Sequence, residues 1–148
     1  MRFMIIIHAD ARSEAGAAPS KELIEAMGRY NEELVKAGVM VGGEGLHPSS
    51  KGARVTFSRG KAPVVLDGPF SESKELIAGF WLFQTQSREE AIEWVKRIPE
   101  DPHSSEDWTV EIRQVFETAD FPAEVMSPEE AAREHALRDE LARRQSAS

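Results

Sequence analysis

The chain has 148 residues, of which 41% are hydrophobic and 30% charged, and its formal net charge is −8. This composition predicts one soluble globular domain. The acidic balance disfavours a nucleic-acid surface. The absence of cysteine excludes disulfides, thiolate nucleophiles and sulfur-ligated metal sites. The apolar run at the start ends at His8, which is too short for a signal peptide or a membrane span, so we expect a cytoplasmic protein with no membrane partner.

The first part of the chain predicts a strand, a loop and a helix. Residues 3–9 are rich in isoleucine and apolar on both faces, as in a central strand. The small residues of 9–19 predict an irregular loop. Ser20 is a suitable N-cap for the helix, and Gly38 is expected to end it in a left-handed conformation. The apolar positions at helical spacing are Leu23, Met27, Tyr30 and Leu34, widened by Ile24 and Val35.

Strand patterns dominate the middle of the chain. Residues 39–41 begin a strand that continues into the glycine-rich segment 42–46. Residues 54–58 and 62–67 then predict a hairpin, and the aromatic run 78–84 predicts a further strand.

A second helix and a last strand follow. Ser87 and Glu90 have the spacing of a capping box, and Pro99 is expected to end the helix that this box begins. Residues 108–115 predict the last strand, in which Val110 and Ile112 alternate with charged residues.

The order of these elements predicts the fold class. Strand–helix–strand, an inserted hairpin and a second strand–helix–strand unit indicate an α+β, ferredoxin-like antiparallel sheet with two helices on one face. The other face needs a cover, because its apolar residues would otherwise form a large exposed patch. We therefore expect a homodimer packed sheet to sheet. Residues 1–118 are expected to form the domain, and 119–148 a helical extension that is disordered from 145.

The four residues Asp67, Gly68, Pro69 and Phe70 predict a tight turn after a strand. Such a turn would hold the Asp67 carboxylate on the rim of a sheet, where it is available for chemistry. Alternatively, the carboxylate accepts hydrogen bonds from its own turn and has a structural role. In that case the Phe70 ring is expected to fill the core.

The histidines are candidates for acid–base chemistry. None has a partner at metal-ligand spacing, so no metal and no cofactor is expected. His8 ends the first strand, and with Asp67 it has the groups required for general acid–base catalysis. The alternative is that His8 and His47 are exposed loop residues. Four further residues are candidate ligand contacts near this pair, namely Glu44, His47, Glu72 and Arg113.

Several motifs together resemble the DGPF branch of the YCII-related domain family. They are Gly43-Glu44-Gly45-Leu46, Asp67-Gly68-Pro69-Phe70 with Glu72 and Lys74-Glu75, Gly79-Phe80-Trp81, the helix end Trp94–Pro99, and Val110-Glu111-Ile112-Arg113. The resemblance covers about residues 1–118 and implies a dimeric α/β-barrel assembly of ferredoxin-like subunits. It also implies similarity to proteins encoded beside extracytoplasmic-function sigma factors.

The resemblance bears on catalysis as well. It implies an acid–base pair of a histidine and an aspartate for the wider family, with the histidine on the first helix. The comparable stretch here, residues 27–32, contains no histidine. The pair of the wider family therefore does not transfer to this chain.

Two functions remain open from the sequence. The first is a small-molecule-binding or sensing dimer, linked through the resemblance to sigma-factor regulation. The second is a cofactor-free enzyme in which a His/Asp pair performs acid–base catalysis on a small polar substrate. The basic residues of the predicted hairpin are too sparse for a nucleic-acid surface. They are Lys51, Arg54, Arg59 and Lys61.

Overall fold

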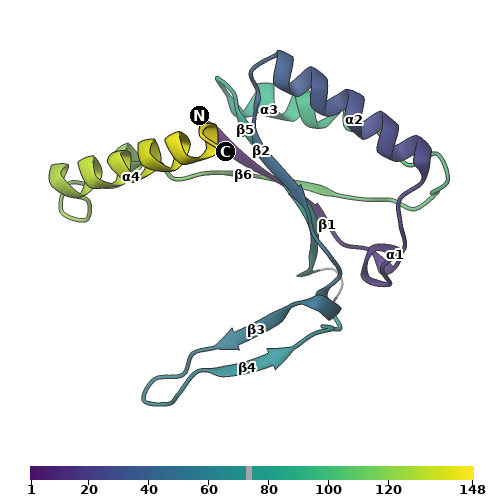
Figure 1. Ribbon diagram of the computed structural model, residues 1–148, viewed down its shortest axis with the longest axis horizontal. Helices are drawn as coiled ribbons and strands as arrows, with labels where there is room; N and C mark the ends of the chain where they lie inside the picture. Colours follow the sequence, from purple (N-terminus) through teal and green to yellow (C-terminus); the bar gives the residue numbers. More distant parts are fainter. Residues whose placement is uncertain (73–74) are drawn as a thin grey trace. The chain divides into compact units, whose positions relative to one another are not determined.

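The computed structural model describes residues 1–72 and 75–148, so Lys74 of the motif that follows Phe70 lies outside the described residues. The chain forms two compact units, Met1–Gln114 and Val115–Ser148 (Figure 1). The elements of the first unit are β1 (Arg2–His8), α1 (Ala11–Glu14), α2 (Lys21–Lys36), β2 (Met40–Gly45), η1 (Ser49–Lys51), β3 (Ala53–Thr56), β4 (Val64–Asp67), β5 (Ile77–Gln84), α3 (Arg88–Val95) and β6 (Val110–Gln114). The second unit contains η3 (Thr118–Asp120) and α4 (Pro128–Ser146).

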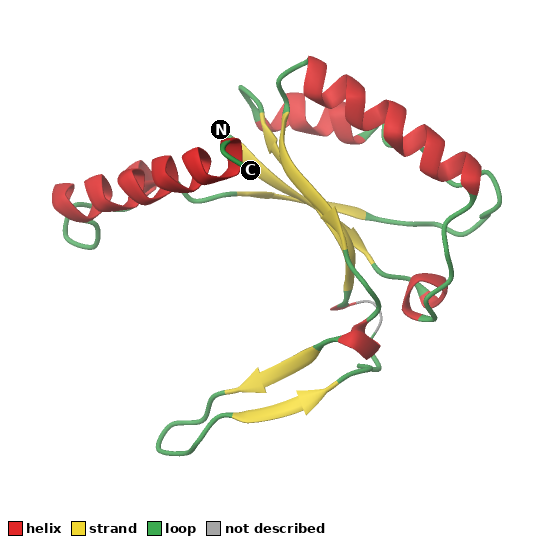
Figure 2. Ribbon diagram, in the orientation of Figure 1, coloured by secondary structure: helices red, strands yellow, loops and turns green. Residues whose placement is uncertain are grey.

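The central sheet has four strands in the order β2-β5-β1-β6, and its neighbouring strands are antiparallel. The long β1 and β5 occupy the middle, as expected of apolar strands. Helices α2 and α3 lie on the same side of this sheet (Figure 2). The α+β class with an antiparallel sheet is confirmed, and the strand order is compatible with a ferredoxin-like fold.

The core lies between the sheet and the two helices. Strand register places Phe3 opposite Phe83 and Ile5 opposite Trp81, and all four side chains are buried. Tyr30 packs edge-on against Trp81 with ring centroids 5.6 Å apart. Leu34 from α2, Ala91 from α3 and Ile98 complete the buried cluster with these residues.

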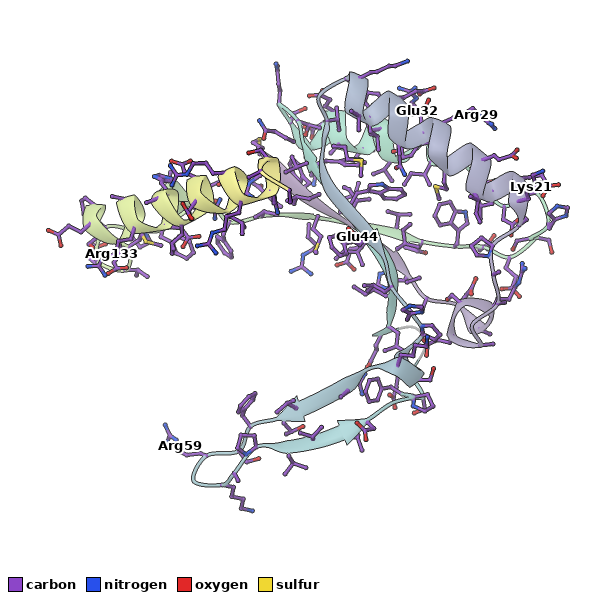
Figure 3. The ribbon with its side chains drawn as sticks, viewed as in Figure 1. Lys21, Arg29, Glu32, Glu44, Arg59 and Arg133 are labelled. Atoms are coloured by element: carbon purple, nitrogen blue, oxygen red, sulfur yellow. The ribbon has the colours of Figure 1, made fainter. Side chains whose placement is uncertain are left out.

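Helix α2 begins and ends where the sequence predicts. The Ser20 hydroxyl oxygen accepts a hydrogen bond from the Leu23 N–H at 3.1 Å, and Gly38 follows the last turn with φ +70°. The expected widening of the apolar face is wrong, because Ile24 and Val35 are exposed. The helix therefore contacts the sheet along a narrow stripe, and its charged residues Lys21, Arg29 and Glu32 are on its outer side (Figure 3).

The sheet face opposite α2 and α3 carries both apolar and charged side chains. The register puts Met4, Ile6, Phe80 and Leu82 on this face, and each is half-buried. The same alternation puts Glu111 there, because Glu111 pairs with Ile6. We call this surface the helix-free face, because neither α2 nor α3 packs on it.

Two local expectations differ from the structure. Residues 9–19 are not wholly irregular, because α1 forms a single turn with Asp10 as its N-cap. At α3 the Ser87 hydroxyl oxygen accepts the Glu90 N–H at 3.1 Å, but the Glu90 carboxylate accepts the Gln86 N–H at 2.8 Å, one residue before the cap.

The second unit is a loop followed by a charged helix. Phe116 and Phe121 stack with centroids 5.0 Å apart, and Arg138 pairs with Glu117 at 3.2 Å. Pairs three or four residues apart stabilise α4 along its length. No helix among the described residues is long and apolar enough to cross a membrane.

Candidate functional site

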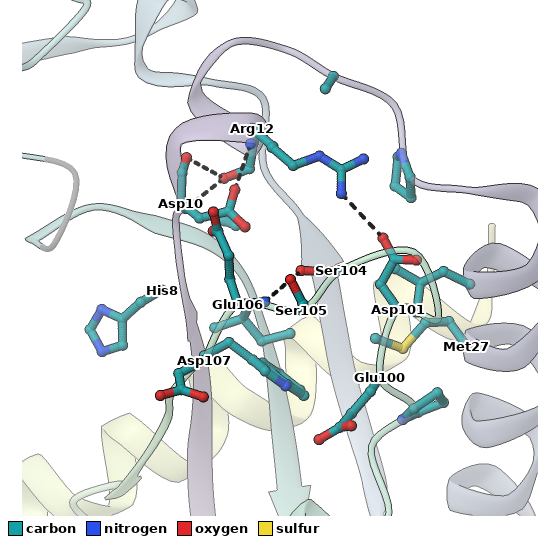
Figure 4. Close-up of a pocket in the computed structure, with 18 of the residues that line it drawn as sticks. His8, Asp10, Arg12, Met27, Glu100, Asp101, Ser104, Ser105, Glu106 and Asp107 are labelled. Atoms are coloured by element: carbon teal, nitrogen blue, oxygen red, sulfur yellow. Dashed lines mark hydrogen bonds and ion pairs between the residues drawn. The ribbon is translucent and has the colours of Figure 1, made fainter.

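A cleft of about 610 Å³ lies within the first unit (Figure 4). It is bounded by the end of β1, by α1, by the start of α2 and by residues 99–108. Ile7, Leu23 and Met27 supply its apolar lining. This volume is within the range of small-molecule sites, about 300–1,000 Å³.

Helix α1 places polar groups on one wall of the cleft. The Asp10 carboxylate accepts the Ser13 N–H at 2.8 Å, and the Ser13 hydroxyl oxygen accepts the Asp10 N–H at 2.9 Å. This capping box fixes a turn that is otherwise too short to be stable alone. It holds Arg12 at the rim of the cleft.

Asp101 organises the opposite wall. Its carboxylate accepts the His103 N–H at 2.9 Å and the Ser20 hydroxyl at 3.4 Å. The Arg12 guanidinium approaches the same carboxylate at 3.6 Å. Asp101 thereby connects α1, the start of α2 and the loop after α3.

The charge of the lining is predominantly negative. Its carboxylates are Asp10, Glu100, Asp101, Glu106 and Asp107. Arg12 of α1 is already engaged by one of them, Asp101. The lining therefore offers more hydrogen-bond acceptors than donors to a ligand.

Trp108 is the aromatic residue of the cleft. Trp81 is buried and Trp94 is half-buried, whereas Trp108 is 43% exposed. An exposed indole beside an apolar floor provides a flat surface for a ligand.

His8 lines the cleft at the end of β1, but its ring is directed away from Arg12 and Asp101 (Figure 4). The His8 Nε2 lies 3.6 Å from Oε1 of Glu111, and the two side chains are 29% and 41% exposed. The His8 Nδ1 is buried without a hydrogen-bond partner among the described residues. Arg113 contacts the same Glu111 carboxylate at 3.2 Å, so two predicted site residues meet at a glutamate that was not predicted.

The other predicted site residues do not line this cleft. Asp67, at the end of β4, is exposed and lies opposite Ala53 in the hairpin. Its carboxylate has no hydrogen bond or ion pair with any residue that the structure describes, including its own turn. Glu44 and His47 are exposed, and the Glu72 carboxylate accepts a hydrogen bond from Ser71 at 3.0 Å.

The turn after β4 has a clear structural role. The Ser49 Oγ accepts the Phe70 N–H at 3.0 Å and donates to the Glu14 carboxylate at 2.5 Å. A Cβ on Gly68 would lie 1.8 Å from the Ser49 carbonyl oxygen, so only glycine fits there. Phe70 does not fill the core as expected. It is half-buried and lies under the Arg54 guanidinium, 3.9 Å from the ring centroid.

Sequence reasoning missed the cleft residues Arg12, Asp101 and Trp108, and the His8 partner Glu111. The alternation of residues 110–113 already placed Glu111 beside Arg113 on one strand face, and this was the available signal. The three cleft residues come from segments whose proximity depends on how the loops leave the sheet.

The chain is similar to a known protein family and to a curated bacterial protein. The model of the YCII-related domain family matches residues 1–118. An uncharacterised protein of Rhizobium meliloti strain 1021 is 24% identical over 103 residues, which cover 70% of this chain and 82% of that protein. The chain belongs to the YCII-related domain family.

Proposed function

We propose that this protein binds a small molecule in the cleft between α1, α2 and the 99–108 loop, and that it acts as a binding or sensing protein. The observation that supports the proposal is the cleft itself, which combines an apolar floor, an exposed indole and a polar wall. Ligand sites commonly combine an apolar lining with a few fixed polar groups. A link to sigma-factor regulation is part of this proposal and rests on the resemblance of the sequence motifs.

The lining favours one chemical class of ligand. The carboxylates outnumber Arg12, which is paired with Asp101 at 3.6 Å. Amine or other donor groups are complementary to such a wall, whereas an anionic ligand would be repelled. An apolar portion of the ligand would pack on Leu23, Met27 and Trp108.

A thermal-shift screen against amines, carboxylic acids and neutral metabolites tests the proposal. Amine-bearing compounds should raise the melting temperature, because a ligand that binds the folded state stabilises it. The variant Ala18→Phe, which fills the cleft from an exposed loop position, should abolish these shifts. Ala147→Phe, at the exposed C-cap of α4, is the matched control and should retain them. Equal shifts in the two variants would place the binding elsewhere.

The second candidate function is a cofactor-free acid–base enzyme, favoured by the contact between His8 and Glu111. An imidazole beside a carboxylate has the groups that general acid–base catalysis requires. Asp67, the partner expected from the sequence, is exposed outside the cleft. For this function we therefore propose Glu111 in its place, with Arg113 positioning the carboxylate.

Turnover of a bound compound separates the two functions. If the protein is an enzyme, His8→Gln and Glu111→Gln should lower kcat while the compound still binds. Binding without turnover in the unmodified protein would support the sensing function instead.

We also propose that two copies pack through their helix-free faces to form a homodimer. Four half-buried apolar residues on this face support the proposal, since a second copy would remove them from water. They are Met4, Ile6, Phe80 and Leu82. Sedimentation at micromolar concentration should give twice the 16.5 kDa mass of the chain, and a monomer mass would contradict the dimer.

A further inference from the structure

The β3–β4 hairpin is apolar on both faces and exposed on both. The register pairs Val55 with Val65, and Thr56 with Val64. Because side chains alternate along a strand, Val55 and Val65 share one face and Val64 and Leu66 the other. All four are exposed, and Phe57 beyond the end of β3 is 78% exposed. The hairpin is separate from the four-stranded sheet (Figure 2).

Such a hairpin is poorly suited to remain in water. An isolated two-stranded ribbon is marginally stable without further packing. Strands with consecutive apolar residues, such as Val64, Val65 and Leu66 here, are usually covered on both faces. The exposed apolar surface therefore indicates a binding partner.

The base of the hairpin is fixed although the strands are exposed. The Gly68 N–H donates to the Gly52 carbonyl at 2.9 Å across the base. Ser49 joins this base to Glu14 of α1 and to Phe70. Because its base is fixed, the hairpin projects in a defined direction. It therefore loses less conformational entropy when it binds a partner than a flexible loop would.

The net charge of the hairpin indicates the kind of partner that it binds. Residues 51–67 contain four basic residues and one carboxylate, a net charge of +3, so the other residues of the chain carry −11. Arg59 lies at the tip of the arm (Figure 3). The rest of a second copy carries the opposite net charge, and on its helix-free face the apolar residues lie beside Glu44 and Glu111. Arg113 lies on the same face and pairs with Glu111, so Glu44 is the carboxylate we expect the arm to approach.

We propose that the β3–β4 hairpin is an exchange arm that packs on a second copy of this chain, at the margin of the helix-free face beside the sheet-to-sheet contact. In a two-fold dimer each copy gives one arm and receives one. The inference rests on the homodimer proposed above and adds the element that holds it together.

Analytical ultracentrifugation of three proteins tests the arm. Val65→Asp combined with Leu66→Asp places a charge on each face of the hairpin without touching the core. Val35→Asp combined with Ile24→Asp is the matched control, because it adds the same charge at two exposed apolar residues of α2, which are 63% and 57% exposed against 63% and 59% for Val65 and Leu66. The double variant should weaken dimerisation by about tenfold or more, whereas the control should dimerise as the unmodified chain does. Circular dichroism should show that each variant remains folded.

The outcomes separate the two proposals. A monomeric unmodified chain overturns both the dimer and the arm. A dimeric unmodified chain whose double variant dimerises equally well overturns the arm alone.

A charge variant tests the choice of partner surface. Arg59→Glu combined with Lys61→Glu should weaken the dimer at low salt, and high salt should reduce the difference from the unmodified chain. Equal dimer affinity at low salt would overturn the electrostatic contribution of the arm to docking.

Discussion

Replacing Gly68 by alanine tests the close packing at the base of the hairpin. The added Cβ would lie 1.8 Å from the carbonyl oxygen and 2.7 Å from the carbonyl carbon of Ser49. These are backbone atoms, so the chain must shift. Overpacking of this kind costs about 1–3 kcal/mol.

The shift also disturbs hydrogen bonds that converge on the turn. The Gly68 N–H donates to Gly52 at 2.9 Å and the Phe70 N–H to Ser49 at 3.0 Å. Each such bond contributes about 0.5–1.5 kcal/mol. We expect Gly68→Ala to lower the free energy of unfolding by about 2–4 kcal/mol.

Urea unfolding followed by tryptophan fluorescence, at one fixed protein concentration, measures this loss. Gly52→Ala is the matched control. Its backbone is extended, with φ −113°, and its Cβ would lie 3.5 Å from the same Ser49 oxygen. The control should be neutral or stabilising by about 0.4–1 kcal/mol. Equal unfolding midpoints for the two variants would refute the close packing of Gly68.

Two further predictions concern pH. Burial raises the pKa of the Tyr30 hydroxyl above its ordinary value of 10.0. The contribution of Tyr30 to the free energy of unfolding should therefore be complete below pH 10 and be lost as the pH rises beyond it, because the unfolded chain then releases the proton more readily. Tyr30→Phe removes the 2.8 Å bond to the Trp94 carbonyl and should cost about 1 kcal/mol at neutral pH. It should also flatten the alkaline loss measured by urea unfolding, and an unchanged alkaline slope would contradict this. In α4, hydrogen bonds from Arg144 and then Arg143 lower the pKa of Glu140 below its ordinary value of 4.5. The helix end should therefore lose order as the pH falls through that lowered pKa, which NMR shifts of the full chain would show, and Glu140→Gln should lack this acid step.

The sheet and long helices were predictable because their signals are periodic and local. The apolar run of β1, the Ser20 cap and Gly38 each specify one element without help from distant residues. The width of the buried stripe of α2 was not predictable. Val35 has the right spacing and hydrophobicity, but its burial depends on how much of the helix the sheet can cover.

The candidate site was harder to predict because it is made by loops. Asp10 and Asp101 are ninety-one positions apart, and they line one cleft because the end of β1 and the loop after α3 both border it. The one-turn helix α1 depends on a capping box, a pattern too short to identify against the small residues around it. At Asp67 the sequence signal was strong, but its cause was structural. The turn residues reflect the close packing at Gly68 and do not mark a chemical role of the Asp67 carboxylate.

The indole N–H signal of Trp108, followed by NMR during titration with amine-bearing metabolites, tests the central claim most directly. Trp108 lines the cleft, whereas Trp81 is buried in the core and donates to Asn31 at 2.9 Å. A ligand in the cleft should shift the Trp108 signal in a saturable manner and leave the Trp81 signal in place, and Ala18→Phe should abolish the shift. If no compound moves the Trp108 signal, or if Ala18→Phe binds as the unmodified chain does, the cleft is not a ligand site.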